Sequence, residues 1–210
     1  MLSDTLIYET LDLRGTETTA LPDGLKVIGN MLLSGCPISR LPFGLEVGGN
    51  LFIDRTNIAA LPPDLGVKGN LYMRQSRIEA IQEGLEIVGS VDLQGSPITV
   101  LPDGWSVPGW LSLCDCPIPA LPENLTVGRD LFLCGSGIVE LPQSLIVARD
   151  VYLSETDRIA IRADAQIGGV VVLKLDSGGS VPEARVMTAE EYAVKHRSIT
   201  VSQRRSLTMR

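Results

Sequence analysis

The sequence predicts a mainly β repeat solenoid of about eight 20-residue coils with a small C-terminal cap. A large apolar residue recurs every 20 positions without insertion, and a fixed period of this size is typical of stacked repeat units. Within each period, two short segments place an apolar residue at every second position, which is the pattern of strands. The residues that mark the period are Leu21, Leu41, Leu61, Ile81, Leu101, Leu121, Leu141 and Ile161.

The unit at residues 41–60 shows how one coil is built. Leu45 and Val47 alternate with one residue between them, as do Leu51 and Ile53. Two short strands are therefore predicted, with these apolar side chains pointing inward. A glycine at the corner between the strands either permits a tight turn or lets another backbone approach closely. The corner glycines are Gly29, Gly49, Gly69, Gly89, Gly109 and Gly169.

A recurring proline defines the third side of the coil. Proline has no amide hydrogen and favours an extended backbone in the residue before it, so this side is expected to be irregular. Each coil would then add one strand to a parallel sheet, at a spacing of about 4.8 Å. The solenoid is predicted for residues 1–175, with atypical coils at its ends. The prolines are Pro22, Pro42, Pro62, Pro102, Pro122 and Pro142.

The segments LFIDRTNIAALPPDL and LFLCGSGIVELPQSL resemble the leucine-rich-repeat pattern L-x-L-x-x-N-x-L-x-x-L-P-x-x-L. The resemblance covers roughly residues 5–175, and the short LP-containing unit is similar to the repeats of IpaH-type bacterial effectors, without their catalytic domain. Thr, Ser or Cys stands where the family has Asn, so the asparagine ladder of the family is absent, and an L-x-V-x-G strand replaces the usual linker. The resemblance implies a protein-binding solenoid with two strands or three sides per coil.

The 20-residue period ends before residues 176–210. Thr188 and Glu191 have the spacing of a capping box, which predicts a short helix near residues 189–195. A strand is expected at residues 199–201. Two roles stay open for this segment: a cap that covers the apolar core of the last coil, or a basic tail that binds a partner.

Charge and hydropathy exclude several classes of protein. Residues 1–175 hold 12 Lys and Arg against 21 Asp and Glu, whereas residues 176–210 hold 6 against 4. The acidic body makes direct nucleic-acid binding unfavourable, because clustered basic residues are needed to neutralise phosphates. No apolar run approaches the roughly 18 to 20 residues of a membrane span, and the first residues lack the pattern of a signal peptide. We expect a cytoplasmic protein, with secretion by a signal-free route left open.

The outward positions of the second strand form the candidate binding face. Two of the three Phe and two of the four Tyr fall on this one row. Exposed aromatic residues favour a partner-binding or self-association surface, although neighbouring rings on a parallel sheet also stabilise the stack itself, and the two roles are compatible. The predicted partner-binding residues, including those of the adjacent polar row, are Leu32, Phe52, Asp54, Tyr72, Arg74, Asp92, Phe132 and Tyr152.

Cysteine and histidine provide little support for catalysis. Cys114 and Cys134 occupy equivalent outward positions on successive coils, and we expect them to be reduced thiols, whereas Cys36 and Cys116 fall on an inward position. The only histidine, His196, lies in the C-terminal segment. No nucleotide-binding or phosphate-binding motif is present, and the glycines follow the repeat. We therefore predict no catalytic site, no cofactor and no metal.

The sequence thus predicts a non-catalytic scaffold for protein–protein interaction, of bacterial or phage character, whose partner is a protein. An alternative is an effector or inhibitor whose acidic solenoid imitates a nucleic acid and occupies a basic groove. Regularly spaced outward carboxylates would favour the alternative. The candidates, Asp12, Asp54, Asp92, Asp130 and Asp150, are only partly regular, so this function ranks second.

Overall fold

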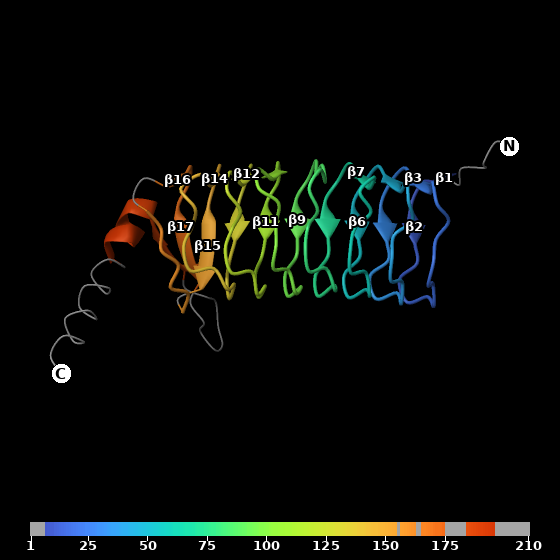
Figure 1. Cartoon of the computed structure of the whole chain (residues 1–210), viewed down its shortest axis with the longest axis horizontal. Coiled ribbons are helices and arrows are strands. Elements are labelled where there is room, and N and C mark those ends of the chain that lie inside the picture. The colour runs from blue at the N-terminus through green and yellow to red at the C-terminus, as the bar shows by residue number, and fades with distance from the viewer. Residues whose placement is uncertain (1–6, 155, 163–164, 175–183, 196–210) are drawn as a thin grey trace.

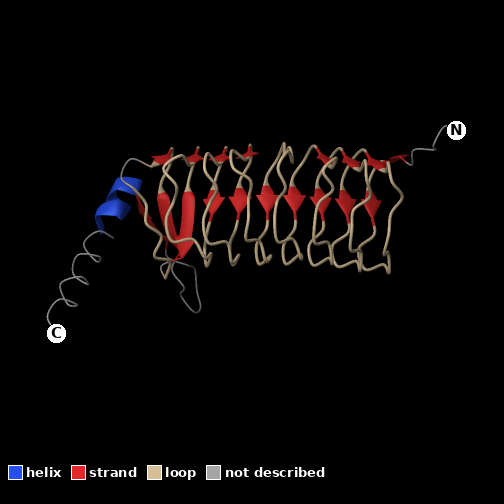
Figure 2. Ribbon diagram, in the orientation of Figure 1, coloured by secondary structure: helices blue, strands red, loops and turns tan. Residues whose placement is uncertain are grey.

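The computed structural model describes residues 7–154, 156–162, 165–174 and 184–195, which form a row of stacked coils (Figure 1). The coils follow one another in chain order, and the strands of successive coils pair with each other. One ten-stranded sheet runs along one side of the stack, and two four-stranded sheets lie along a second side (Figure 2). The predicted parallel β-solenoid of about eight 20-residue coils is confirmed.

The strands are short, and most contain two residues. The ten-stranded sheet contains β2 (Leu11–Asp12), β4 (Met31–Leu32), β6 (Leu51–Phe52), β8 (Leu71–Tyr72), β9 (Val91–Asp92), β11 (Leu111–Ser112), β13 (Leu131–Phe132), β15 (Val151–Ser154), β17 (Val171–Lys174) and β18 (Ala184–Met187). The first small sheet contains β1 (Ile7–Tyr8), β3 (Lys26–Val27), β5 (Glu46–Val47) and β7 (Gly66–Val67). The second contains β10 (Ser106–Val107), β12 (Thr126–Val127), β14 (Ile146–Val147) and β16 (Gln166–Ile167).

Strands of the large sheet from β2 to β17 are parallel and in register, so that each residue lies beside the one 20 positions later. In β6 and β8, for example, Leu51 pairs with Leu71 and Phe52 with Tyr72. Because side chains alternate between the two faces of a strand, Leu51 and Leu71 are fully buried while Phe52 and Tyr72 lie on the outer face. The apolar letters of the repeat therefore form one continuous core.

A ladder of polar side chains runs through the corner before most strands of the large sheet. Asn50 donates its backbone amide to the Asn30 side-chain oxygen at 2.8 Å, and Asn70 donates to Asn50 at the same distance. Ser90 donates its amide to Asn70, also at 2.8 Å. Asparagine side chains thus form a ladder at the corner, which is a different position from the one at which the family carries Asn.

The residues at the position where the family carries Asn also form hydrogen bonds with backbone groups. The Thr56 hydroxyl donates to the Ile53 carbonyl at 2.8 Å, and the Ser96 hydroxyl donates to the carbonyl of Met73 in the previous coil at 2.7 Å. Each buried hydroxyl thus finds a backbone carbonyl as its hydrogen-bond partner away from water.

The corner glycines are required by close backbone approach. A Cβ added at Gly69 would lie 2.6 Å from the carbonyl carbon of Gly49, whereas one added at Gly66 in the same coil would meet nothing closer than 3.8 Å. The corner glycines do not have a positive φ, in contrast to Gly35 and Gly95 in the turns after the strands. Close approach, not an unusual backbone angle, therefore disfavours a side chain at Gly69, where the neighbouring backbone would have to shift; the equivalent corner of later coils carries Arg129 and Arg149.

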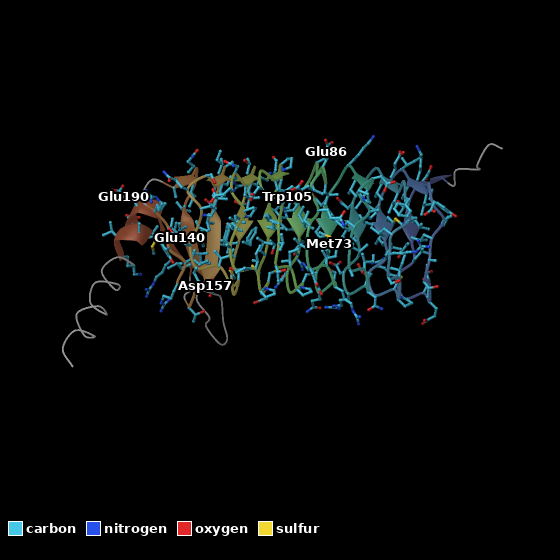
Figure 3. All side chains as sticks on the ribbon, viewed as in Figure 1. Met73, Glu86, Trp105, Glu140, Asp157 and Glu190 are labelled. Atoms are coloured by element: carbon cyan, nitrogen blue, oxygen red, sulfur yellow. The ribbon has the colours of Figure 1, made fainter. Side chains whose placement is uncertain are left out.

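The two small sheets are separated at residues 86–87, which form no strand (Figure 3). In the preceding coil Gly66 donates its amide to the Leu45 carbonyl at 3.0 Å, but the Leu85 carbonyl accepts the Trp105 indole N–H at 3.3 Å. Pro108 stands where Lys68 donates an amide to Val47, and proline has no hydrogen to donate. Trp105 and Pro108 therefore account for the interruption.

The C-terminal end of the stack is covered by later residues. Strand β18 pairs antiparallel with β17, and a helix at residues 189–195 follows it (Figure 1). The predicted capping box is formed: the Thr188 amide donates to the Glu191 carboxylate at 2.8 Å, and the Glu191 amide donates to the Thr188 hydroxyl at 3.1 Å. Tyr192 is fully buried and belongs to the solenoid core. The strand expected at residues 199–201 lies outside the described residues.

One coil near this end departs from the repeat. The 20-residue spacing places Arg158 at the inward isoleucine position, but Arg158 is exposed and Ile159 is buried instead. The core is kept apolar because the chain shifts by one residue within this coil.

We predict that Gly69→Ala lowers the free energy of unfolding by about 1–3 kcal/mol, because the added methyl collides with backbone that cannot rotate away. Gly66→Ala is the matched control, and it should change stability by less than about 1 kcal/mol, in the stabilising direction, because it only restricts the unfolded chain. Chemical denaturation of both variants measures the difference. Equal stabilities would contradict the role of close approach.

Burial against the last coil raises the pKa of Tyr192 from 10.0 to about 12. The neutral phenol is thus favoured in the folded state, and this contribution to stability is complete below pH 10 and is lost as the pH rises toward 12. We predict that Tyr192→Phe removes this part of the alkaline loss of stability. Denaturation midpoints between pH 8 and 12 test it, and identical pH profiles for the two proteins would contradict the placement of Tyr192.

Candidate functional site

The outer face of the ten-stranded sheet carries the predicted binding residues. Leu32, Phe52, Tyr72, Phe132 and Tyr152 all lie on its outward row, and each side chain is partly buried. Their backbones are held in line because each belongs to a strand that pairs in register with its neighbours. The sequence thus places these five residues correctly on one face.

The aromatic rings on this row stack in two pairs. The ring centroids of Phe52 and Tyr72 are 4.5 Å apart with an interplanar angle of 4°. Phe132 and Tyr152 are also 4.5 Å apart, at 18°. The distance follows from the sheet, since in-register parallel strands are about 4.8 Å apart and present identical positions side by side. Stacking therefore accounts for part of the burial of each ring.

Trp110 joins the two pairs, and it was not among the predicted site residues. Its ring centroid lies 6.2 Å from that of Tyr72 and 6.1 Å from that of Phe132. Because Tyr72 and Phe132 are three coils apart, the indole must lie over the intervening positions, Asp92 and Ser112. We call the five residues Phe52, Tyr72, Trp110, Phe132 and Tyr152 the aromatic stripe.

The sequence contains a signal for Trp110. It occupies the corner position that holds Asn30, Asn50 and Asn70 in earlier coils, and an aromatic residue there breaks the polar ladder. Its backbone amide still makes the hydrogen bond of the ladder, donating to the Ser90 hydroxyl at 3.1 Å. The outward positions of the strands do not include Trp110, because its side chain reaches the row from the corner.

Beneath the stripe, Asp92 forms an ion pair with Arg74. The Asp92 side chain is 1% exposed, and its carboxylate accepts the Arg74 Nε–H at 2.5 Å and the Gln94 amide at 3.2 Å. The hydrogen bond to Asp92 raises the pKa of Arg74 above its ordinary value. Asp92 was predicted as a partner-binding residue, but its burial makes it a support for Arg74, whose side chain is 55% exposed.

The turns after the strands form a polar edge beside the stripe. Asp54 accepts the Ser34 hydroxyl at 3.0 Å and the Arg74 amide at 2.8 Å. Arg55 and Gln75 follow, with Arg55 Nε donating to the Gln75 side-chain oxygen at 2.8 Å. These side chains line a shallow groove of about 580 Å³. The predicted residues Asp54 and Arg74 therefore lie together, on the border between the polar edge and the stripe.

Three residues on this edge adopt a positive φ without being glycine. The values are 54° for Arg55, 51° for Gln75 and 57° for Asp115. Glycine fills the same turn position in other coils, as Gly35, Gly95 and Gly135, and it does so without steric cost. Backbone strain of this kind at an exposed edge is a feature of binding sites.

The face combines an aromatic centre with a polar border on a regular backbone, which is the composition of a protein-binding surface. Its carboxylates are held by amides or arginines and are not arranged as an acid and base pair. The part of the chain that the structure describes contains no group of three or more potential metal ligands. Within the same part, no helix is long and apolar enough to cross a membrane.

We predict that Arg74→Met lowers the free energy of unfolding by about 1–3 kcal/mol, because it leaves the buried Asp92 carboxylate without its strongest donor. Arg40→Met, at an exposed position on another side of the coil, should change stability by less than about 0.5 kcal/mol. Chemical denaturation compares the two variants. A loss no larger for Arg74→Met than for Arg40→Met would show that the ion pair adds no stability.

A comparison of the chain with protein-family models, with curated proteins and with solved structures finds no match in any of the three. The fold itself, a β-solenoid of 20-residue coils, is consistent with a leucine-rich-repeat-like protein. The geometry of the outer face is therefore the basis for proposing a function.

Proposed function

We propose that the protein is a non-catalytic scaffold that binds a protein partner through the aromatic stripe and the adjacent polar edge. The observation that carries this proposal is the continuity of the stripe. Five aromatic residues contact one another in series over six successive coils, on a sheet whose opposite face is the core. Tyr, Trp and Arg are the residues that contribute most often to binding energy at protein interfaces.

The composition of the chain strengthens the proposal. Aromatic residues make up only 4% of the sequence, and five of the nine are on the stripe. Stacking with neighbours explains why each ring is partly buried, but it leaves the outer side of the stripe apolar and open to solvent. Covering such a surface is favourable by about 25 cal/mol for each Å² of apolar area removed from water.

The backbone adds to the suitability of the face. Each strand of the large sheet from β4 to β17 is bonded to neighbours on both sides, and the corner ladder fixes the turns that lead into the strands. Binding to a preorganised surface loses little conformational entropy, so more of the contact energy contributes to affinity. This is the physical advantage of a repeat scaffold over a mobile loop.

A second candidate function is imitation of a nucleic acid by the acidic solenoid. The net charge of -7 favours it. The arrangement of the carboxylates supports it less, because Asp12 pairs with Arg14 at 2.6 Å and Asp130 pairs with Arg149 at 3.6 Å. Asp150 is used to accept the Val170 amide at 2.9 Å. Phosphate imitation needs regular, unpaired negative charges, so protein recognition by the stripe ranks first.

The short LP-containing repeat supports a proposal about the source of the protein and where it acts. It resembles the repeat part of secreted bacterial effectors of the IpaH type, and we propose a bacterial or phage protein that acts in the cytoplasm. A solenoid of this kind would act by occupying its partner.

We predict that a photo-crosslinking amino acid at position 52 or 132 captures a specific partner in native cells, whereas the same residue at position 43 does not. Phe43 is the matched control because it is also a phenylalanine, is 57% exposed and lies in a turn outside the stripe. Mass spectrometry of the crosslinked products identifies the partner. Phe52→Ser should then weaken its binding by about tenfold or more, and Phe43→Ser should leave it unchanged.

Equal crosslinking from positions 52 and 43 would contradict recognition by the stripe. The salt dependence of binding distinguishes the two candidate functions. A partner of the stripe should retain most of its affinity at high ionic strength, whereas a basic protein that binds a nucleic-acid mimic should lose it steeply.

A further inference from the structure

Cys114 and Cys134 lie side by side on the outer face of the ten-stranded sheet. The strands that precede them, β11 and β13, pair in register, and the ladder continues beyond them because the Asp115 amide donates to the Cys134 carbonyl at 2.9 Å. Both side chains are partly exposed. The two cysteines therefore lie in equivalent turns of successive coils, just after β11 and β13.

The two outward cysteines contact each other. A side-chain hydrogen bond joins Cys114 to Cys134, and another joins Cys114 to Ser112. Cys36 and Cys116, by contrast, are buried inside the coils. Thiolates are the form of cysteine that binds metals. The repeat thus places two neighbouring thiols on the outside and buries the other two.

The spacing of the pair suits a bridging ion better than a disulfide. In-register parallel strands hold equivalent Cβ atoms about 4.8 Å apart, whereas disulfides need about 3.5–4.5 Å. A metal–thiolate bond is about 2.3 Å long for zinc, so an ion midway between two sulfurs would hold them about 4.6 Å apart. An ion can therefore join the thiols without bending the strands.

The number of ligands selects the kind of ion. Zinc and iron sites need four ligands, but the described residues offer no group of three or more His, Cys, Asp and Glu. Soft monovalent ions with a filled d shell accept two thiolates in a linear arrangement, and thiolates prefer Cu(I) among the biological metals. The site is open to such an ion through a groove of about 650 Å³, lined by Trp110, Phe132 and Tyr152 as well as by both cysteines.

We propose that Cys114 and Cys134 form a two-coordinate thiolate site for a soft monovalent metal ion, with Cu(I) as the biological candidate. Binding breaks two S–H bonds and forms two S–Cu bonds, and two protons are released to solvent. The copper stays Cu(I), so no oxidant or reductant takes part. The site is independent of the proposed protein partner.

The test uses Cu(I) with the purified full-length chain under anaerobic conditions, in competition with a chromogenic Cu(I) chelator. We expect one Cu(I) per chain, with a protein that remains monomer-sized in native mass spectrometry. Cys114→Ser and Cys134→Ser should each weaken binding at least tenfold. Cys36→Ser is the matched control, since Cys36 is buried inside the coil and should leave the affinity unchanged.

A second measurement does not rely on variants. Bound Cu(I) should protect Cys114 and Cys134 of the unmodified protein from alkylation, as read by peptide mass spectrometry. Three results would each overturn the proposal: no Cu(I) retained against the chelator, equal affinity in Cys114→Ser and Cys36→Ser, or a copper ion held between two chains. If crosslinking at positions 52 and 132 captures no partner while Cu(I) still binds, only the protein-binding role of the stripe is contradicted.

Discussion

In-register stacking of one coil on the next is the constraint on which the whole molecule depends. Every strand of the large sheet up to β17 bonds to a strand one coil away, and the corner backbones approach so closely that a Cβ at Gly69 would collide with Gly49. Once this spacing is fixed, each position of the repeat becomes a row that runs along the stack. Inward rows form the core, and the corner row becomes the ladder of Asn30, Asn50 and Asn70. No single coil could bury its own apolar residues, so each coil is stable only when it is packed against the next one.

The same constraint decides what the surface can do. Outward residues lie outside the apolar core, so they can differ from coil to coil, but their spacing is imposed by the backbone. Aromatic residues placed on the outward row must therefore stack, as Phe52 does on Tyr72, and two cysteines on that side of the sheet must become neighbours. The aromatic stripe and the thiol pair share Trp110, Phe132 and Tyr152 as borders. A metal ion on the thiols would consequently lie next to the surface that we propose for a partner.

The middle coils show how the face accommodates a charge. Asp92 lies on the outward row between Tyr72 and Ser112, and a carboxylate buried without a partner would be costly. Arg74 donates to it from the adjacent coil, and the Gln94 amide supplies a second bond. Trp110 extends over this position from the corner and keeps the stripe continuous. The indole thus continues the ring contacts across Asp92. The ion pair stabilises the buried carboxylate and holds Arg74 at the polar edge.

The sequence by itself determined the period, the inward residues, the two strands of most coils and the capping box of Thr188 and Glu191, because these depend on local patterns. It also placed Phe52, Tyr72, Phe132 and Tyr152 on one face. Only the tertiary structure decided what joins them: Trp110 reaches the row from a corner, Asp92 is buried by its neighbours, and Ile159 replaces Arg158 in the core. These outcomes depend on which side chains of different coils fill the same space, and a pattern along one strand does not contain that information.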